Sequence, residues 1–153
     1  MNRIMIVDDF APYRDVLREY LSQQPDFQVV GEAGNMHDAI ESIGILSPHL
    51  VVTDLSMPDT HGVEAVSEIK RHYAQVKILV VSSHREIEYK LKCRMAGAAG
   101  YIVKDAIYDE LLDGIRTVLG GKIYMGADTG DNARPDFLPD AVATKEEPST
   151  FLH

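Results

Sequence analysis

The feature that most restricts the fold of this chain is an apolar, β-branched run that ends in one carboxylate, Val51-Val52-Thr53-Asp54. Pro58 follows shortly afterwards and prevents a strand or helix from continuing. Such a run is typical of a strand buried on both faces of a parallel sheet. Ligands of open α/β sheets bind at the carboxyl ends of the strands, so we expect a functional carboxylate at this strand tip.

Four further apolar runs have the same character, and a segment with helical periodicity follows each of the five. We expect strands at residues 3–7, 27–33, 50–53, 77–81 and 100–103. We expect helices at about residues 12–24, 36–46, 63–73, 87–96 and 108–119. Five β-α units with no hairpin between the strands predict an α/β fold, in which a five-stranded parallel sheet has helices on both faces.

Composition restricts the class of protein further. The chain has 153 residues, of which 45% are hydrophobic and 25% charged, as in an ordinary globular domain. No apolar run approaches the ~18 residues of a membrane span. Twenty-four acidic against fifteen basic residues give a net charge of −9, which argues against nucleic-acid binding by this chain itself. The single cysteine fits a reducing compartment, so we expect a cytoplasmic location and no membrane partner.

Polar residues follow the expected strands at one edge of the sheet. They are Asp8 and Asp9 after the first strand, Asp54 after the third, Ser82 after the fourth and Lys104 after the fifth. Three carboxylates ~4 Å apart repel by roughly 1 kcal/mol per pair in water, and by several at an effective dielectric of about 20. A hard divalent cation, Mg²⁺ or Mn²⁺, would remove this penalty.

This set of groups predicts a site that receives a phosphoryl group. Asp54 would be the nucleophile and form an acyl phosphate, while Lys104 and the metal neutralise the phosphoryl oxygens. The hydroxyl of Ser82 would donate a hydrogen bond to one of these oxygens. Asp9 would bind the metal directly and Asp8 through water.

Two more residues lie close to this expected site. Ser56 and His84 each come two residues after a site residue, so they should flank the path of the attacking water and tune its rate. The backbone carbonyl of Ser56 is a further expected metal ligand.

Four motif segments lie between residue 3 and about residue 124. They are Val7-Asp8-Asp9 with Arg14, Val29-Val30-Gly31-Glu32-Ala33, Asp54-Leu55-Ser56-Met57-Pro58 with Gly62, and Ala96-Gly97-Ala98-Ala99-Gly100-Tyr101-Ile102-Val103-Lys104-Asp105. In these segments the sequence resembles a response-regulator receiver domain, and more narrowly the N-terminal half of LuxR/FixJ-type (NarL-like) regulators.

The resemblance implies a flavodoxin-like sheet of strand order 2-1-3-4-5 with five helices. It also implies Mg²⁺-dependent phosphoryl transfer from a cognate sensor histidine kinase, slow self-dephosphorylation rather than enzymatic turnover, and a phosphorylation-dependent homodimer. Ser82 and Tyr101 match the family's switch pair, in which the hydroxyl moves toward the phosphoryl group and the ring turns inward. Phe10 departs from the histidine that members often carry, with little expected effect on the chemistry.

The expected domain covers residues 1–124, and residues 125–153 are predicted to be a flexible linker or disordered tail with no helix-turn-helix domain. DNA would then be bound only through an effector domain that is not in this chain, as the N-terminal part of a transcriptional regulator. The alternative is a stand-alone receiver or docking module that acts by protein contact. A haloacid-dehalogenase-like phosphohydrolase is remote, since Ser56 stands where that chemistry needs a second aspartate.

The fourth expected helix gives weaker signals. Ile87, Leu91 and Met95 recur at helical spacing along it. We interpret Cys93 as a small buried filler, and Lys90, Lys92 and Arg94 as a solvated face. The histidines outside the site lack metal-ligand spacing and are predicted to be surface residues.

Overall fold

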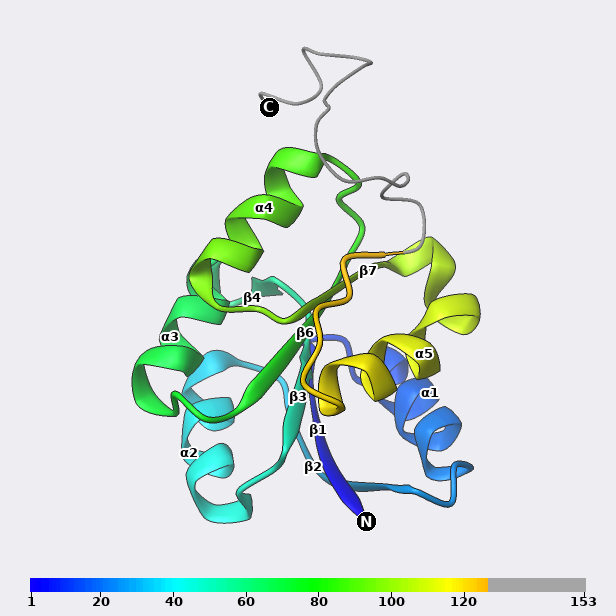
Figure 1. Cartoon of the computed structure of the whole chain (residues 1–153). Helices are drawn as coiled ribbons and strands as arrows, with labels where there is room; N and C mark the ends of the chain where they lie inside the picture. The colour runs from blue at the N-terminus through cyan, green and yellow to red at the C-terminus, as the bar shows by residue number, and fades with distance from the viewer. Residues whose placement is uncertain (127–153) are drawn as a thin grey trace.

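Five parallel strands form the central sheet of the computed structural model, which describes residues 1–126. Their order is β2-β1-β3-β6-β7 (Figure 1). The bounds are Asn2–Val7 for β1, Phe27–Ala33 for β2, Leu50–Thr53 for β3, Lys77–Ser82 for β6 and Gly100–Val103 for β7. Because β6 and β7 are the fourth and fifth expected strands, the predicted topology is confirmed. The predicted tail lies, from residue 127 onward, outside the described residues.

Helices cover both faces of this sheet. The bounds are Ala11–Ser22 for α1, Met36–Leu46 for α2, Glu64–His72 for α3, Ile87–Ala96 for α4 and Ile107–Leu119 for α5, with a 3₁₀ turn at Lys104–Ala106. Helices α1 and α5 pack on one face, and α2, α3 and α4 pack on the other (Figure 1). Within residues 1–126, no helix is long and apolar enough to cross a membrane.

The register of the strands places the carboxyl ends of β1, β3 and β6 side by side. Val7 pairs with Thr53, and Thr53 pairs with Val80 on the next strand. The backbone N–H of Asp54 continues this ladder and donates to the carbonyl of Val7 at 2.9 Å. All four residues of β3 are buried, as expected for a strand with helices on both faces. The carboxylates that follow β1 and β3 are therefore neighbours.

A short hairpin lies in the loop after β3, outside the five strands of the central sheet, which are joined without hairpins as expected. Strands β4 (Ser56–Met57) and β5 (Thr60–His61) pair in antiparallel fashion directly after Asp54. Pro58 lies in the two-residue connection between them and has the fixed φ that such a turn accommodates. The sequence pattern did not indicate the hairpin because two-residue strands carry no periodicity.

The buried side of α4 also differs from the expectation. Leu91 is 45% and Met95 86% exposed, whereas Lys90 and Cys93 are buried. The interpretation of Cys93 as a buried filler is thus confirmed, but that of Lys90 as a solvated residue is wrong. Both stripes fit a helical period, and periodicity alone does not say which one faces the sheet.

The N-terminus of α2 is held by two side chains. Asn35 accepts a hydrogen bond from the N–H of Asp38 at 2.8 Å, as an N-cap residue does. Asp59, from the turn between β4 and β5, accepts from the N–H groups of Met36 at 2.8 Å and His37 at 2.9 Å. These two bonds hold the pKa of Asp59 below its usual value of 3.8. The loop after Asp54 is therefore tied to α2.

We expect Asp59→Ala to lower the free energy of unfolding by about 1 kcal/mol at neutral pH, because two helix N–H groups lose their acceptor. The folded-state pKa of Asp59 is lowered, so its stabilisation is present above the unfolded-state value and is lost as the pH falls through the lowered value. Urea unfolding of the wild type and Asp59→Ala over this pH range measures the difference. Glu41→Ala, on the exposed side of α2, is the control, and a difference independent of pH would contradict the prediction.

Candidate functional site

Three carboxylates gather at the carboxyl ends of β1 and β3. Oxygens of Asp8, Asp9 and Asp54 lie within 4.8 Å of one another. Asp8 is 2% and Asp54 9% exposed, whereas Asp9 faces solvent. The convergence expected from the sequence is therefore present for these acids, which form a shallow site with two sheltered carboxylates and one open to water.

Lys104 lies opposite these acids at the start of the 3₁₀ turn that follows β7. Its Nζ is 3.3 Å from Oδ2 of Asp54 and 3.7 Å from Oδ2 of Asp8. The ammonium also lies over the ring of Tyr13 from α1, 4.6 Å from the ring centroid. Tyr13 thus helps to hold the ammonium of Lys104 through a cation–π contact.

Backbone N–H groups orient the two sheltered carboxylates. Oδ1 of Asp54 accepts from the N–H of Leu55 at 2.7 Å, and Oδ1 of Asp8 accepts from that of Phe10 at 2.9 Å. The other oxygen of each carboxylate faces Lys104. Each acid thus keeps one oxygen in a fixed bond and presents the second to the site.

The charge balance of this site suits a divalent cation. Three carboxylates and one ammonium leave two negative charges in a largely buried place. Burial raises the pKa of Asp8, and the neighbouring charges of Asp54 and Asp9 raise it further against the opposing effects of the Phe10 N–H and Lys104. Carboxylate oxygens in this number, with one side open to water, match the donor set of Mg²⁺.

Ser82 and Tyr101 lie at the ends of the neighbouring strands β6 and β7. Ser82 is 2% exposed, and its Oγ accepts from the N–H of His84 at 3.1 Å. The ring of Tyr101 is fully buried in the inward position, and its hydroxyl donates to the carbonyl of His84 at 2.7 Å. Burial strongly raises the pKa of the Tyr101 hydroxyl, which stays protonated and donates. The backbone of His84 therefore joins the two residues.

The two expected rate-tuning residues have exposed side chains. Ser56 lies in β4, directly beyond Asp54 and Leu55. The ring of His84 stacks on Tyr89 at a centroid distance of 4.2 Å and lies 3.6 Å from a carboxylate oxygen of Glu86. Their expected role in tuning the attack of water stays a prediction.

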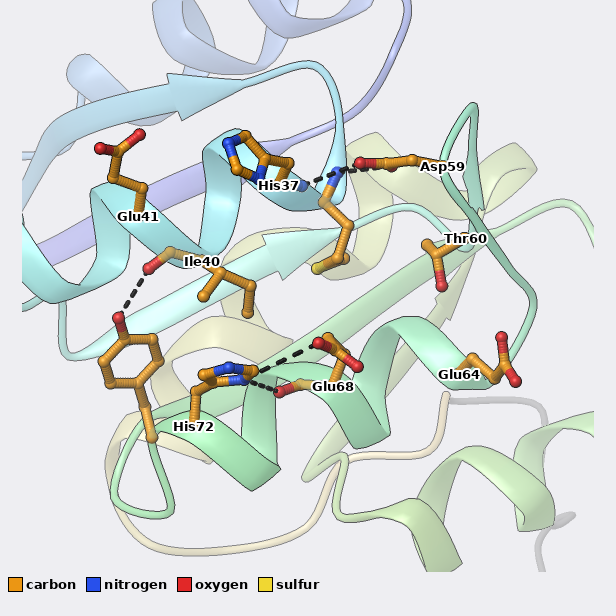
Figure 2. Close-up of a pocket in the computed structure, with 10 residues that line it drawn as sticks. His37, Ile40, Glu41, Asp59, Thr60, Glu64, Glu68 and His72 are labelled. Carbon is orange, nitrogen blue, oxygen red and sulfur yellow. Dashed lines mark hydrogen bonds and ion pairs between the residues drawn. The ribbon is translucent and has the colours of Figure 1, made fainter.

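A separate groove of about 640 Å³ lies between α2 and α3 (Figure 2). None of the expected site residues lines it. Asp59, Glu64 and Glu68 give it an acidic wall. His37, predicted to lack metal-ligand spacing, has a ring nitrogen within 4.8 Å of a carboxylate oxygen of Asp38 and of one of Glu41, and all three residues are exposed.

Three residues of the site's surroundings were missed by the sequence reasoning. Asp59 ties the loop after Asp54 to α2, and Tyr13 underlies Lys104. Arg14 was noted only for its place in a motif. Its Nη1 donates to the carbonyl of Asp8 at 2.5 Å, while its Nε lies 3.1 Å from Glu32. The helical position of Tyr13 and Arg14, one turn after the acidic pair, was the available signal.

Comparison with known proteins agrees with this geometry. A model of the response regulator receiver domain family matches residues 4–116. The response regulator UvrY of Escherichia coli K12 is 36% identical over 128 residues, which is 84% of this chain and 59% of UvrY. The chain spans little more than half the length of the curated relatives it matches.

Solved structures of response regulators have the same fold. A LuxR-family two-component response regulator from Aurantimonas sp. SI85-9A1 superposes with a TM-score of 0.79 at 32% identity, covering 84% of this chain and 92% of that one. The isolated receiver domain of RcsB from Salmonella enterica serovar Typhimurium, solved with the phosphomimetic BeF₃⁻, superposes at 0.76 with 25% identity, covering 82% and 94%. The chain belongs to the response-regulator receiver family. It is a receiver domain of the type found in LuxR/NarL-family response regulators.

The raised pKa of Asp8 gives a prediction for the metal-free protein. The folded state binds the Asp8 proton more tightly than the unfolded chain does, so stability falls as the pH rises through the titration of this carboxyl group. We expect Asp8→Asn to raise the free energy of unfolding at pH 7 by on the order of 1 kcal/mol, because the asparagine carbonyl still accepts from Phe10.

Thermal unfolding with and without Mg²⁺ measures this effect. The wild type is expected to be stabilised by Mg²⁺ and the Asp8→Asn variant to respond much less. Asp105→Asn, at an exposed position, is the control. A lower unfolding temperature for Asp8→Asn without Mg²⁺ would contradict the prediction.

Proposed function

We propose that this domain accepts a phosphoryl group on Asp54 from a cognate sensor histidine kinase and passes the signal on by protein association. The observation that carries the proposal is the position of Lys104, whose ammonium lies 3.3 Å from Asp54 within a group of three carboxylates. A carboxylate so placed has a cation beside it to balance the charge that an incoming phosphoryl group adds.

The proposed transfer moves one phosphoryl group between two nucleophiles. An oxygen of Asp54 attacks the phosphorus of a phosphohistidine, the N–P bond breaks and an O–P bond forms, and the released imidazole takes a proton from water. Bound Mg²⁺, or Mn²⁺, supplies positive charge next to the phosphoryl oxygens. Asp8, Asp9, Asp54 and the backbone carbonyl of Ser56 would hold it. Lys104 balances a second phosphoryl oxygen, and the Ser82 hydroxyl donates to another.

The proposed output is a rearrangement around Tyr101. The Ser82 hydroxyl would turn toward the phosphoryl group and leave room for the Tyr101 ring in the inward position. The ring occupies this inward position in the structure. This change would alter the surface of α4, β7 and α5 and favour a homodimer. Ser56 and His84 would set the slow rate at which water removes the phosphoryl group, so the domain is a signalling phosphoacceptor rather than an enzyme.

The length of a relative supports a proposed role within a longer protein. The match covers 84% of this chain but only 59% of UvrY, so the proposed role is that of the N-terminal domain, residues 1–124, of a cytoplasmic transcriptional regulator. DNA would be bound through an effector domain and not by this chain.

Intact-mass spectrometry with acetyl phosphate and Mg²⁺ tests the chemistry. The wild type is expected to gain one labile phosphoryl group and Asp54→Asn none, since the amide is not a nucleophile. Asp113→Asn, at an exposed position of α5 away from the site, is the matched control and should be phosphorylated normally. An adduct that persists in Asp54→Asn would disprove the assignment. Rapid turnover of phosphate esters would favour a phosphohydrolase, and no adduct with any donor would favour a docking module.

Sedimentation tests the switch. Tyr101→Phe removes only the hydroxyl bond to the His84 carbonyl, so we expect it to accept the phosphoryl group but to dimerise on phosphorylation about tenfold more weakly, the effect of a lost hydrogen bond. Tyr73→Phe is the matched control, because it removes a tyrosine-to-carbonyl bond of the same length elsewhere. Equal dimerisation of wild type and Tyr101→Phe would count against a switch that depends on this bond.

A further inference from the structure

Lys90 is a buried lysine that the proposed phosphoryl chemistry does not use. It is 5% exposed, although lysine is among the residues least often buried. Lys92, two positions further along α4, is exposed and pairs with Glu88 at 3.6 Å. An ammonium group taken out of water must find acceptors or negative charge in its new surroundings. The groups that contact Lys90 therefore indicate the role of its buried ammonium.

Met125 and Tyr101, from distant parts of the chain, are among the groups that contact its ammonium. Nζ donates to the backbone carbonyl of Met125 at 3.3 Å. It also lies over the ring of Tyr101, 5.8 Å from the centroid, within the range of a cation–π contact. Lys90 thus contacts the expected switch residue and the segment that follows the last helix.

That segment, residues 121–126 and here called the exit segment, runs along the outer edge of β7 (Figure 1). The N–H of Tyr124 donates to the carbonyl of Ala99 at 2.9 Å, and the N–H of Tyr101 donates to the carbonyl of Tyr124 at 2.7 Å. Gly100 and Tyr124 form an isolated parallel bridge. Tyr101 therefore touches the exit segment through its own backbone as well as through Lys90.

Successive side chains of the exit segment anchor it on opposite faces of the sheet. Tyr124 packs against the core on the α1 and α5 side, and its hydroxyl donates to Glu110 at 3.0 Å. Met125 packs against the core on the α2, α3 and α4 side. This alternation is that of a strand, and it brings the carbonyl of Met125 to α4.

We propose that Lys90 is a positioning residue that couples the ring of Tyr101 to the exit segment, so that phosphorylation of Asp54 changes how firmly the chain is held where it leaves the domain. This inference rests on the proposed function and extends it to a route of output. With the ring inward, the ring excludes water from the ammonium and strengthens its bond to Met125. With the ring outward, water reaches Lys90, competes for that bond and loosens the exit segment.

NMR-detected amide exchange on the 153-residue chain tests the coupling, with Mg²⁺ and beryllofluoride as the phosphoryl mimic. In the wild type, exchange at Tyr101 and Tyr124 is expected to slow by about fivefold when the mimic binds, since both amides bond the exit segment to β7. Lys90→Met keeps an unbranched apolar side chain, one atom shorter than lysine, and removes the charge and the donor, so this slowing should disappear. Lys92→Met, at the exposed position of the same helix, is the matched control and should keep it.

Two other amides keep the outcomes distinct. The N–H of Leu55 bonds to Asp54 and that of His84 bonds to Ser82, so both report the mimic at the site itself. If neither changes in the wild type, the proposed function fails. If both change but Tyr101 and Tyr124 do not, or if Lys90→Met keeps their slowing, the coupling by Lys90 is overturned. Should Lys90→Met fail to fold, Lys90→Gln removes the charge but keeps a polar side chain with an N–H donor, and it is expected to lose at least half of the slowing.

Discussion

The parallel register of β1 against β3 is the constraint on which the site depends. Because Val7 and Thr53 pair directly, and the N–H of Asp54 bonds to the carbonyl of Val7, the acids that follow the two strands must be neighbours. A shift by one residue would turn every side chain of β3 to the opposite face and would move Asp54 away from Asp8. The packing of the β3 side chains against the helices on both faces therefore secures the register, and through it the geometry of the carboxylates.

Repulsion between the carboxylates of the site has an electrostatic cost to the stability of the fold. Asp8 and Asp54 are held in low-exposure positions with like charges beside them, and the backbone N–H groups of Phe10 and Leu55 fix one oxygen of each. Lys104 compensates only in part. A protein that maximised its own stability would not arrange its acids in this way, which is the usual mark of a functional site.

Much of this architecture was predictable from the sequence, for a physical reason. Strands buried on both faces must be continuous apolar runs, so the five strands and the polar residues at their tips could be identified directly. The orientation of α4 could not be predicted, because Ile87, Leu91 and Met95 share an apolar helical stripe. In the structure, Lys90 and Cys93 face the sheet instead. A lysine with a long apolar stem can enter a core when its ammonium finds partners, and only tertiary structure supplies those partners.

The bond between β7 and Tyr124 has a consequence for self-association. The outer edge strand of a sheet offers unpaired backbone groups, which invite another molecule to add a strand. In this domain the amides of Tyr101 and Tyr124 are already used along that edge. Sheet extension by a second copy at this point would first have to peel the chain away. At this edge, a second copy is thus directed toward contacts between side chains, which can form and break without disrupting the fold.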